Sequence, residues 1–437
     1  MSKILNLLAW MAVVAGLVGS TILPEITNIA TLSLMGVGLL ILATAPATRA
    51  VLAQPTVWVP LLAGLVLLVA LLFTATTPIH VLVIFVLAPL WLVGPHAALL
   101  SRLKDRLTPE LIVRLALLGT AGAALVAGFD VLVLGADRGG FIVNNPIHLA
   151  DIALMLGLIT PIGLLDRGKH RYVYLLGPVL ALATIWFSGS RGPLLAFVPM
   201  LICGAAALAW FTLPRRAALL STIATIALVG VAGFVVLGSP LAGRMGQFNE
   251  VVSLLSTGVV PEQFLDHERL TMLQSAWNAW LASPIYGHGM IDYTHIAGTY
   301  APPGNPYAPS GHLHNDIADF AVIGGTLGLA AYGLLLLAPL IGAMRVHGPY
   351  RAAAIYLGLV TSIGYLAMGL TNAMFGILSQ TVLYAVILAL IAVLSVPGDK
   401  RNSALSDKSY QTSVAPNSLV IASRSRRCSS ASGKCSR

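Results

Sequence analysis

Charged residues are scarce in this sequence of 437 residues, because Asp, Glu, Lys and Arg together make up only 9% of it. An ordinary soluble domain has about 25% charged residues. Hydrophobic residues account for 57% of the chain. The composition therefore excludes an ordinary soluble globular protein, and it predicts that a lipid bilayer is the solvent.

Cysteines and nucleotide-binding motifs are also scarce. The three cysteines, Cys203, Cys428 and Cys435, have neither a metal-ligand spacing nor the pattern of a disulfide framework. The sequence has no Gly-rich phosphate loop of the Walker type and no Asp-x-Asp pair for a metal-bound nucleotide sugar. We therefore expect no cofactor and no redox chemistry.

The net charge of +9 does not indicate a nucleic-acid partner, because eight of the 25 Lys and Arg residues fall in the last 38 positions. Segment 397–437 is rich in Ser, Lys and Arg and poor in aromatic residues, so we expect a disordered basic tail. Its basic clusters suit anionic membrane lipids, but a solvated tail is the favoured interpretation.

Apolar runs recur from residue 4 to residue 396, and a span needs about 20 apolar residues. They predict an all-α polytopic membrane protein with about 12 transmembrane helices, a single membrane domain over 1–396 and the tail over 397–437. The first run is interpreted as a retained helix rather than a cleaved signal peptide. The shortest run contains two prolines, and its loss would reverse the orientation of all later spans. The predicted spans are 4–22, 27–46, 57–75, 79–95, 111–129, 147–166, 171–188, 193–212, 217–237, 316–343, 352–374 and 376–396.

Lys and Arg in short loops concentrate on the cytoplasmic side of a membrane. Alternating the loops places thirteen basic residues on one side and four on the other. Both termini are therefore predicted to be cytoplasmic, and the long loop 238–315 external, which is periplasmic for a bacterial inner-membrane protein. The thirteen are Lys3, Arg49, Arg102, Lys104, Arg106, Arg114, Arg167, Lys169, Arg171, Arg215, Arg216, Arg345 and Arg351; the four are Arg138, Arg191, Arg244 and Arg269.

The loop 238–315 holds most of the polar residues outside the tail, and a loop of this length is usually functional. We expect it to be partly helical, with helices near 241–256 and 264–283 and an irregular Pro/Gly-rich stretch over 300–309. The second helix would lie along the membrane interface or pack on the ends of the spans. Its predicted apolar face consists of Leu270, Leu273, Ala276, Trp277, Trp280 and Leu281.

Five of the ten histidines fall in this loop, at positions 267, 288, 295, 312 and 314. Their spacings match no standard zinc motif, whereas imidazole is also a common general base. We therefore expect no metal site.

Two arginines stand out on the predicted external side. Arg191 lies in a tight turn between two apolar runs. An ionisable group at membrane depth indicates a functional site. The alternative is that the Arg191 side chain extends to the lipid head groups. Arg269 belongs either to a substrate site or to a solvated ion pair with its neighbours. His148 and Asp151 share a helical face, and we favour a buried hydrogen-bonded pair.

The sequence His314-Asn315, then nine residues, then Gly325-Thr326-Leu327-Gly328 resembles the motif of the O-antigen ligases. Together with the spans, the long loop and the turn around Arg191, the resemblance extends over most of 1–396. The superfamily also includes O-antigen polymerases and bacterial protein O-oligosaccharyltransferases.

The resemblance implies the transfer of a glycan from undecaprenyl pyrophosphate to a sugar hydroxyl of the lipid A core, by a metal-independent and inverting reaction. It implies that His314 is the general base and that Arg191 is an essential arginine. Arg269 is assigned as the second, from its place in the long loop, and Asn315 would orient the base or bind a sugar. Gly325 and Gly328 would permit close helix packing.

These roles agree with the chemistry of the side chains. Guanidinium groups suit the charge that grows on a leaving pyrophosphate, and a neutral histidine with an intrinsic pKa near 6.5 suits proton removal. The nearest alternative is an O-antigen polymerase. A protein O-oligosaccharyltransferase and a glycan transporter are less favoured. A transporter would show repeat symmetry and paired broken helices, and no such repeat is evident.

Overall fold

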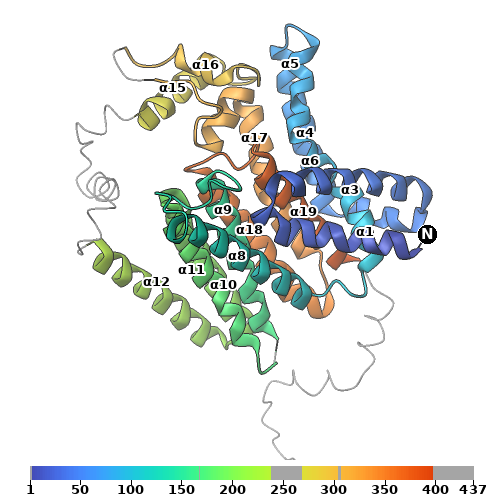
Figure 1. The fold of residues 1–437 in the computed structure, drawn as a ribbon. Helices are drawn as coiled ribbons and strands as arrows, with labels where there is room; N and C mark the ends of the chain where they lie inside the picture. The colour runs from blue at the N-terminus through green and yellow to red at the C-terminus, as the bar shows by residue number, and fades with distance from the viewer. Residues whose placement is uncertain (1, 167, 238–267, 304–306, 397–437) are drawn as a thin grey trace, which may run out of the picture. The chain divides into compact units, whose positions relative to one another are not determined.

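The computed structural model describes residues 2–166, 168–237, 268–303 and 307–396. Within these ranges the chain forms helices and connecting loops, with no β-strand (Figure 1). The α-helices are α1 (Ser2–Val14), α2 (Ser20–Ile22), α3 (Pro24–Thr44), α4 (Pro55–Thr74), α5 (Pro78–Leu82), α6 (Ala88–Trp91), α7 (Val93–Leu100), α8 (Pro109–Leu132), α9 (Pro146–Ile159), α10 (Leu176–Ser188), α11 (Arg191–Thr212), α12 (Arg215–Leu237), α15 (Glu268–Ala282), α16 (Tyr293–Gly298), α17 (Asp316–Met344), α18 (Arg351–Gly369) and α19 (Leu378–Ser395).

Eleven helical stretches among the described residues are long and apolar enough to cross a membrane. Each coincides with a predicted span, and the remaining prediction, 217–237, falls on α12. The prediction of an all-α polytopic membrane protein is therefore confirmed. The stretches are Lys3–Ile22, Pro24–Thr44, Pro55–Thr74, Pro78–Leu103, Pro109–Leu132, Pro146–Leu165, Arg171–Ser188, Arg191–Thr212, Asp316–Met344, Gly348–Gly369 and Leu378–Ser395.

The weakest predicted span, 79–95, extends to Leu103 and is irregular. It passes from α5 through a 3-10 segment, Val83–Leu87, into α6 and α7. Pro89 has no N–H to donate, which disfavours a continuous α-helix through this region. The stretch is nevertheless long and apolar enough to cross a bilayer.

The core is centred on α19, and its residues from Val382 to Val393 are almost completely buried. The ring of Tyr384 lies 4.7 Å from that of Tyr365 and 5.1 Å from that of Phe375. The Tyr365 hydroxyl donates to the Gln380 carbonyl at 2.6 Å, so a polar group inside this apolar core has a partner. These contacts fix the start of α19 beside the end of α18.

The second helix predicted in the long loop is present as α15, whereas the first, 241–256, lies outside the described residues. Helix α15 packs on α16 and the start of α17 (Figure 1). Met272, Ala276 and Ala279 are buried there, while Trp277 is 59% exposed. Leu273, Trp277 and Leu281 of the predicted apolar face are exposed, whereas α15 packs on α17 through a neighbouring face that contains Met272, Ala276 and Ala279. Whether the exposed face meets the membrane stays a prediction.

Helix α17 is broken at Gly325, which has a positive φ of 60°. The segment after α15 fills the break: the Thr326 N–H donates to Pro284 O at 2.7 Å, and the His288 N–H donates to Val322 O at 2.8 Å. A β-carbon at Gly325 would lie 2.6 Å from the carbonyl oxygen of Ile285. The close packing predicted for this glycine is therefore present, but its partner is this loop segment.

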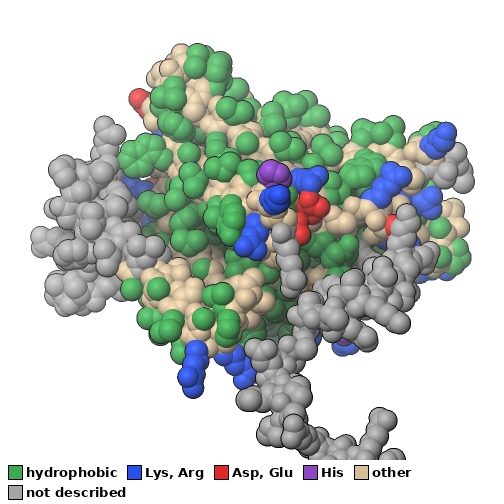
Figure 2. Space-filling view, turned by 90° about the horizontal axis from the view of Figure 1, so that it is seen from below, with side chains coloured by type: hydrophobic (Ala, Val, Ile, Leu, Met, Phe, Trp, Pro, Cys, Tyr) green, Lys and Arg blue, Asp and Glu red, His purple; other side chains and the backbone are tan. Residues whose placement is uncertain are grey.

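Figure 2 shows the molecule from the end opposite α15 and α16. Lys and Arg side chains gather on this face with fewer acidic side chains among large apolar areas. This distribution agrees with the asymmetry of Lys and Arg between the two sides of the predicted spans. The orientation in the membrane remains a prediction.

Candidate functional site

The turn at Arg191 is built from left-handed backbone and a neighbouring arginine. Gly189, with a φ of 63°, ends α10, and Arg191 is the first residue of α11. Arg138 braces the turn from the loop before α9, because its Nε donates to Ser188 O at 2.8 Å and its Nη2 donates to Ser190 Oγ at 3.3 Å. The turn therefore holds Arg191 in place, with its side chain exposed.

The start of α17 meets the same region through the end of α18. Asn315 caps α17, since its side-chain oxygen accepts from the Ala318 N–H at 3.0 Å. Its Nδ2 donates to Leu370 O, also at 3.0 Å. The next residue in the chain, Thr371, packs so closely on Gly192 that a β-carbon there would clash with it. The residues after α18 thus connect the turn at Arg191 with the segment that carries His314.

His314 has an unusual backbone conformation, with a φ of 55°, which is uncommon for a residue other than glycine. Its N–H donates to His312 Nδ1 at 3.2 Å, and the two rings lie 4.3 Å apart. Its own Nδ1 is buried and has no hydrogen-bond partner among the described residues. A strained residue with an unpaired polar atom is typical of a functional site.

Arg269, at the start of α15, is electrostatically coupled to both other predicted residues. Partial burial lowers the pKa of the Arg269 guanidinium, the charge of Arg191 lowers it further, and Glu268 raises it. The pKa of His314 is lowered by burial and then by the charge of Arg269, and is raised by Glu268. Arg269 on α15 therefore interacts electrostatically with a residue of α11 and with the histidine that precedes α17.

Burial also lowers the pKa of His312 to about 4, with smaller contributions from His314, His148 and Arg269. His312 and His314 are therefore both neutral near pH 7. A neutral imidazole is able to accept a proton, which is the property required of a general base.

Two buried carboxylates support the segment that carries these histidines. Asp319 Oδ1 accepts from the Leu313 N–H and from the Tyr293 hydroxyl, both at 2.8 Å. Asp316 Oδ1 accepts from the N–H groups of Met374 and Phe375 at 3.0 and 3.3 Å. Burial and the charge of Asp319 raise the pKa of Tyr293, so its hydroxyl stays protonated as a donor. A cavity of about 220 Å³ opens beside Tyr293, His312 and Asp319.

The predicted pair of His148 and Asp151 is wrong. Asp151 Oδ2 accepts instead from Asn372 Nδ2 at 2.8 Å and from Gln380 Nε2 at 3.2 Å. These amides reach Asp151 from the segment after α18 and from α19, which the sequence did not reveal. His148 is coupled to His314 instead.

The remaining histidines of the loop are elsewhere. His288 Nε2 is bonded to Ala279 O at 2.7 Å, and His295 is exposed on α16. His267 lies outside the described residues. In the part of the chain that the structure describes, no three His, Cys, Asp or Glu side chains gather as metal ligands would.

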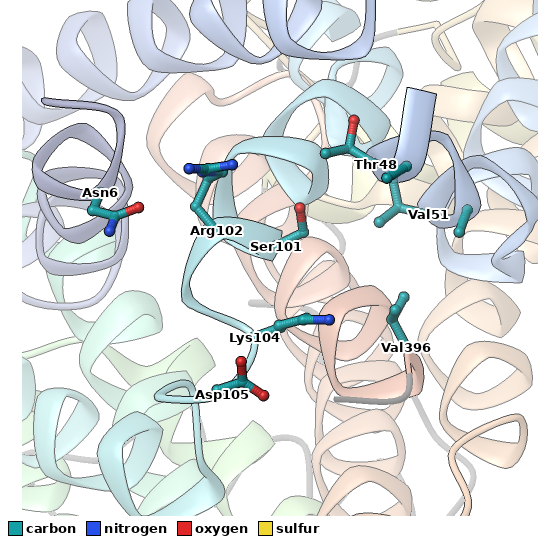
Figure 3. Close-up of a pocket in the computed structure, with 10 residues that line it drawn as sticks. Asn6, Thr48, Val51, Ser101, Arg102, Lys104, Asp105 and Val396 are labelled. Carbon is teal, nitrogen blue, oxygen red and sulfur yellow. The ribbon is translucent and has the colours of Figure 1, made fainter. Parts of the chain in front are cut away.

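A larger cavity of about 360 Å³ contains none of these residues. Figure 3 shows it between the first helix and the loop before α8, with Arg102, Lys104 and Asn6 in its lining. The candidate site is therefore defined by its side chains and not by the volume of a cavity.

In a comparison with protein families, the sequence model of the family described as O-antigen ligase matches residues 176–333. This range begins with α10 and ends within α17, and it includes Arg191, Arg269, His314 and Asn315. The search of curated proteins found no match. The resemblance predicted from the sequence is thus confirmed over this part of the chain.

Proposed function

From the O-antigen ligase family match over residues 176–333, we propose that this protein transfers a glycan from undecaprenyl pyrophosphate to a sugar hydroxyl of the lipid A core. The observation that supports the proposal is the electrostatic interaction of charged residues and a histidine from three separate segments. Charge coupling links Arg269 to both Arg191 and His314. The proposed site is on the periplasmic side of the inner membrane.

The two arginines would bind the pyrophosphate of the donor. Two neighbouring guanidinium groups repel each other, and this repulsion favours the binding of a multiply charged anion between them. Negative charge grows on the pyrophosphate as its bond to the sugar breaks, so the same groups bind the transition state more tightly than the substrate. Arg191 and Arg269 therefore serve both binding and catalysis in this proposal.

His314 would act as the general base. The acceptor hydroxyl oxygen attacks the anomeric carbon from the face opposite the pyrophosphate, and its proton passes to His314. The carbon–pyrophosphate bond breaks as the new glycosidic bond forms, and the electron pair leaves with the lipid pyrophosphate. A single displacement of this kind inverts the anomeric configuration and needs no covalent intermediate.

The test is transfer by the purified full-length protein in lipid nanodiscs with EDTA present. Wild type is compared with His314→Ala, Arg191→Ala and Arg269→Ala, which we expect to lose at least about 100-fold in rate. His295→Ala and Arg351→Ala are matched controls, since both side chains are exposed. Full activity of a folded His314→Ala variant would show that His314 is not the general base.

The acceptor decides between the proposed ligase and its nearest alternative. The same preparation is offered lipid A core in one reaction and a second lipid-linked glycan in another. Transfer to the core supports the ligase, whereas growth of the lipid-linked chain alone would identify a polymerase.

A further inference from the structure

A second polar cavity, of about 320 Å³, lies where three segments of the chain meet. These are the start of α3, the loop before α9 and the start of α19. The lining includes Glu25, Asn28, Phe141, Asn144, Asn145 and Ser379.

Two amide groups at this cavity each have one polar atom without a hydrogen-bond partner among the described residues. Asn28 is only 7% exposed, and its Oδ1 is buried with no hydrogen-bond partner among the described residues. Asn144 uses its Oδ1 to accept from the Asn145 N–H at 2.8 Å, but its buried Nδ2 has no partner there either. Buried amide atoms are rarely left unpaired, because their desolvation destabilises the fold. One unpaired acceptor and one unpaired donor thus belong to residues that line the same cavity.

The chemistry of the lining selects a class of ligand. The amides of Asn28 and Asn144 and the carboxylate of Glu25 suit the hydroxyl groups of a sugar, which both donate and accept hydrogen bonds. The ring of Phe141 is 63% exposed and offers an apolar surface to the C–H face of a pyranose. Among the described residues no Lys or Arg side chain lines the cavity, and Glu25 would repel an anion. A phosphate group is therefore disfavoured, and a neutral sugar fits.

The cavity is connected to the candidate site through its own lining. Asn145 caps α9, accepting from the Ile147 N–H at 2.9 Å, and α9 carries His148 one turn later. The loop that contains Asn144 also contains Arg138, which braces the turn at Arg191. A sugar bound here would therefore lie on the same loop that positions the catalytic arginine.

We propose that this cavity is a subsite for an uncharged pyranose unit of the glycan substrates, contacted by Asn28, Asn144 and Phe141. The proposal rests on the proposed function, because a glycan-transferring enzyme needs subsites for the sugars of its substrates. The sugar belongs either to the donor glycan or to the acceptor core, and both present the same hydroxyl chemistry.

The first experiment measures binding without transfer, so that it does not depend on the reaction. Free core oligosaccharide and free O-antigen oligosaccharide, both without lipid or phosphate, are titrated onto the full-length protein in nanodiscs. Phe141→Ala and Asn28→Ala should each weaken binding of one of the two by about tenfold, the loss expected when a few polar or stacking contacts are removed. The oligosaccharide affected identifies the source of the sugar.

Two matched controls accompany these variants. Asn6→Ala removes an amide from the other cavity, and Phe211→Ala removes an exposed ring at the far end of α11. Both should bind the oligosaccharides as wild type does. If folded Phe141→Ala and Asn28→Ala bind both oligosaccharides as tightly as wild type, the subsite is wrong.

Kinetics separate this proposal from the proposed function. In the transfer reaction, Phe141→Ala should raise the KM for one glycan substrate about tenfold and leave kcat nearly unchanged, whereas Arg191→Ala lowers kcat. Binding lost in Phe141→Ala by a protein that transfers nothing would overturn the proposed function and keep the subsite. Transfer with an unchanged KM in both cavity variants would overturn the subsite and leave the proposed function standing.

Discussion

The hydroxyl of Tyr293 donates a hydrogen bond of 2.8 Å to the carboxylate of Asp319 and thereby ties α16 to the start of α17. The same carboxylate oxygen accepts from the Leu313 N–H, directly before His314. The position of the proposed base therefore depends on a contact between two segments that are separate in the sequence.

Tyr293→Phe removes this hydroxyl while keeping the ring. We expect it to lower the free energy of unfolding by about 1 kcal/mol and the transfer rate by roughly threefold to tenfold, because Asp319, which supports the segment before α17, loses one of its two hydrogen-bond donors. Thermal unfolding and initial rates in nanodiscs measure the two effects. Tyr172→Phe, at an exposed tyrosine, is the control. An unchanged rate would show that Tyr293 does not help to position His314.

Gly325→Ala tests the break in α17. The left-handed backbone and the close approach to Ile285 both disfavour a β-carbon, so we expect a loss of about 1–3 kcal/mol in stability. Gly333→Ala lies in the same helix with no atom within 4 Å of the added carbon, and it should be neutral or slightly stabilising. Denaturant titration of both variants gives the comparison. Equal stabilities would mean that α17 tolerates a regular turn at Gly325.

The spans could be predicted from the sequence because a run of about 20 apolar residues has few alternatives to a membrane helix. The buried face of α15 could not be predicted in the same way. Hydrophobic periodicity favours Leu273 and Trp277, but close packing on α17 selects the small residue Ala279, which is completely buried. The break at Gly325 was also missed, since its filling segment is distant in sequence.

The candidate site was predicted only in part. His314 and Arg191 follow from the resemblance in their motifs, whereas the sequence gives no spacing that fixes Arg269. The sequence identifies Arg138 only as one of the basic residues on the predicted external side, although its side chain hydrogen-bonds to the turn at Arg191. The alternation of His312 and His314 is a signal that could have revealed their contact, but no local pattern relates them to His148.

Acid should destabilise the protein through His312. Its pKa in the folded protein is about 4, below the ordinary value of 6.5, so the unfolded chain binds more protons between these pH values. Stability should be complete above pH 6.5 and decrease as the pH falls toward 4, with a drop in Tm of at least about 2 °C. His312→Gln should reduce this drop, and His295→Gln, at an exposed site, should not. Equal acid sensitivity in all three proteins would contradict the assignment.

The rate should depend on pH through His314. Its pKa is lowered by burial and by Arg269, so kcat/KM should be constant near pH 7 and fall only as the pH drops below 6.5. Arg269→Gln removes the charge and should move the acid limb of its residual activity to higher pH, whereas Arg269→Lys should leave the limb in place. Profiles of kcat/KM against pH measure the shift. Identical limbs in both variants would show that Arg269 does not act on the base.

Asn315 caps α17, and substitutions separate this role from the substrate-binding role predicted for it. Both ends of its amide already bond protein groups, Ala318 N–H and Leu370 O, so we expect positioning to dominate. Asn315→Ala should cost about 1 kcal/mol of stability through the lost cap and slow transfer by lowering kcat. Asn315→Ser keeps a capping oxygen and should recover most of the stability and most of kcat. If instead the serine variant is stable but raises the KM for a glycan as strongly as the alanine variant, Asn315 binds the sugar directly, since a cap alone would not change KM without changing stability.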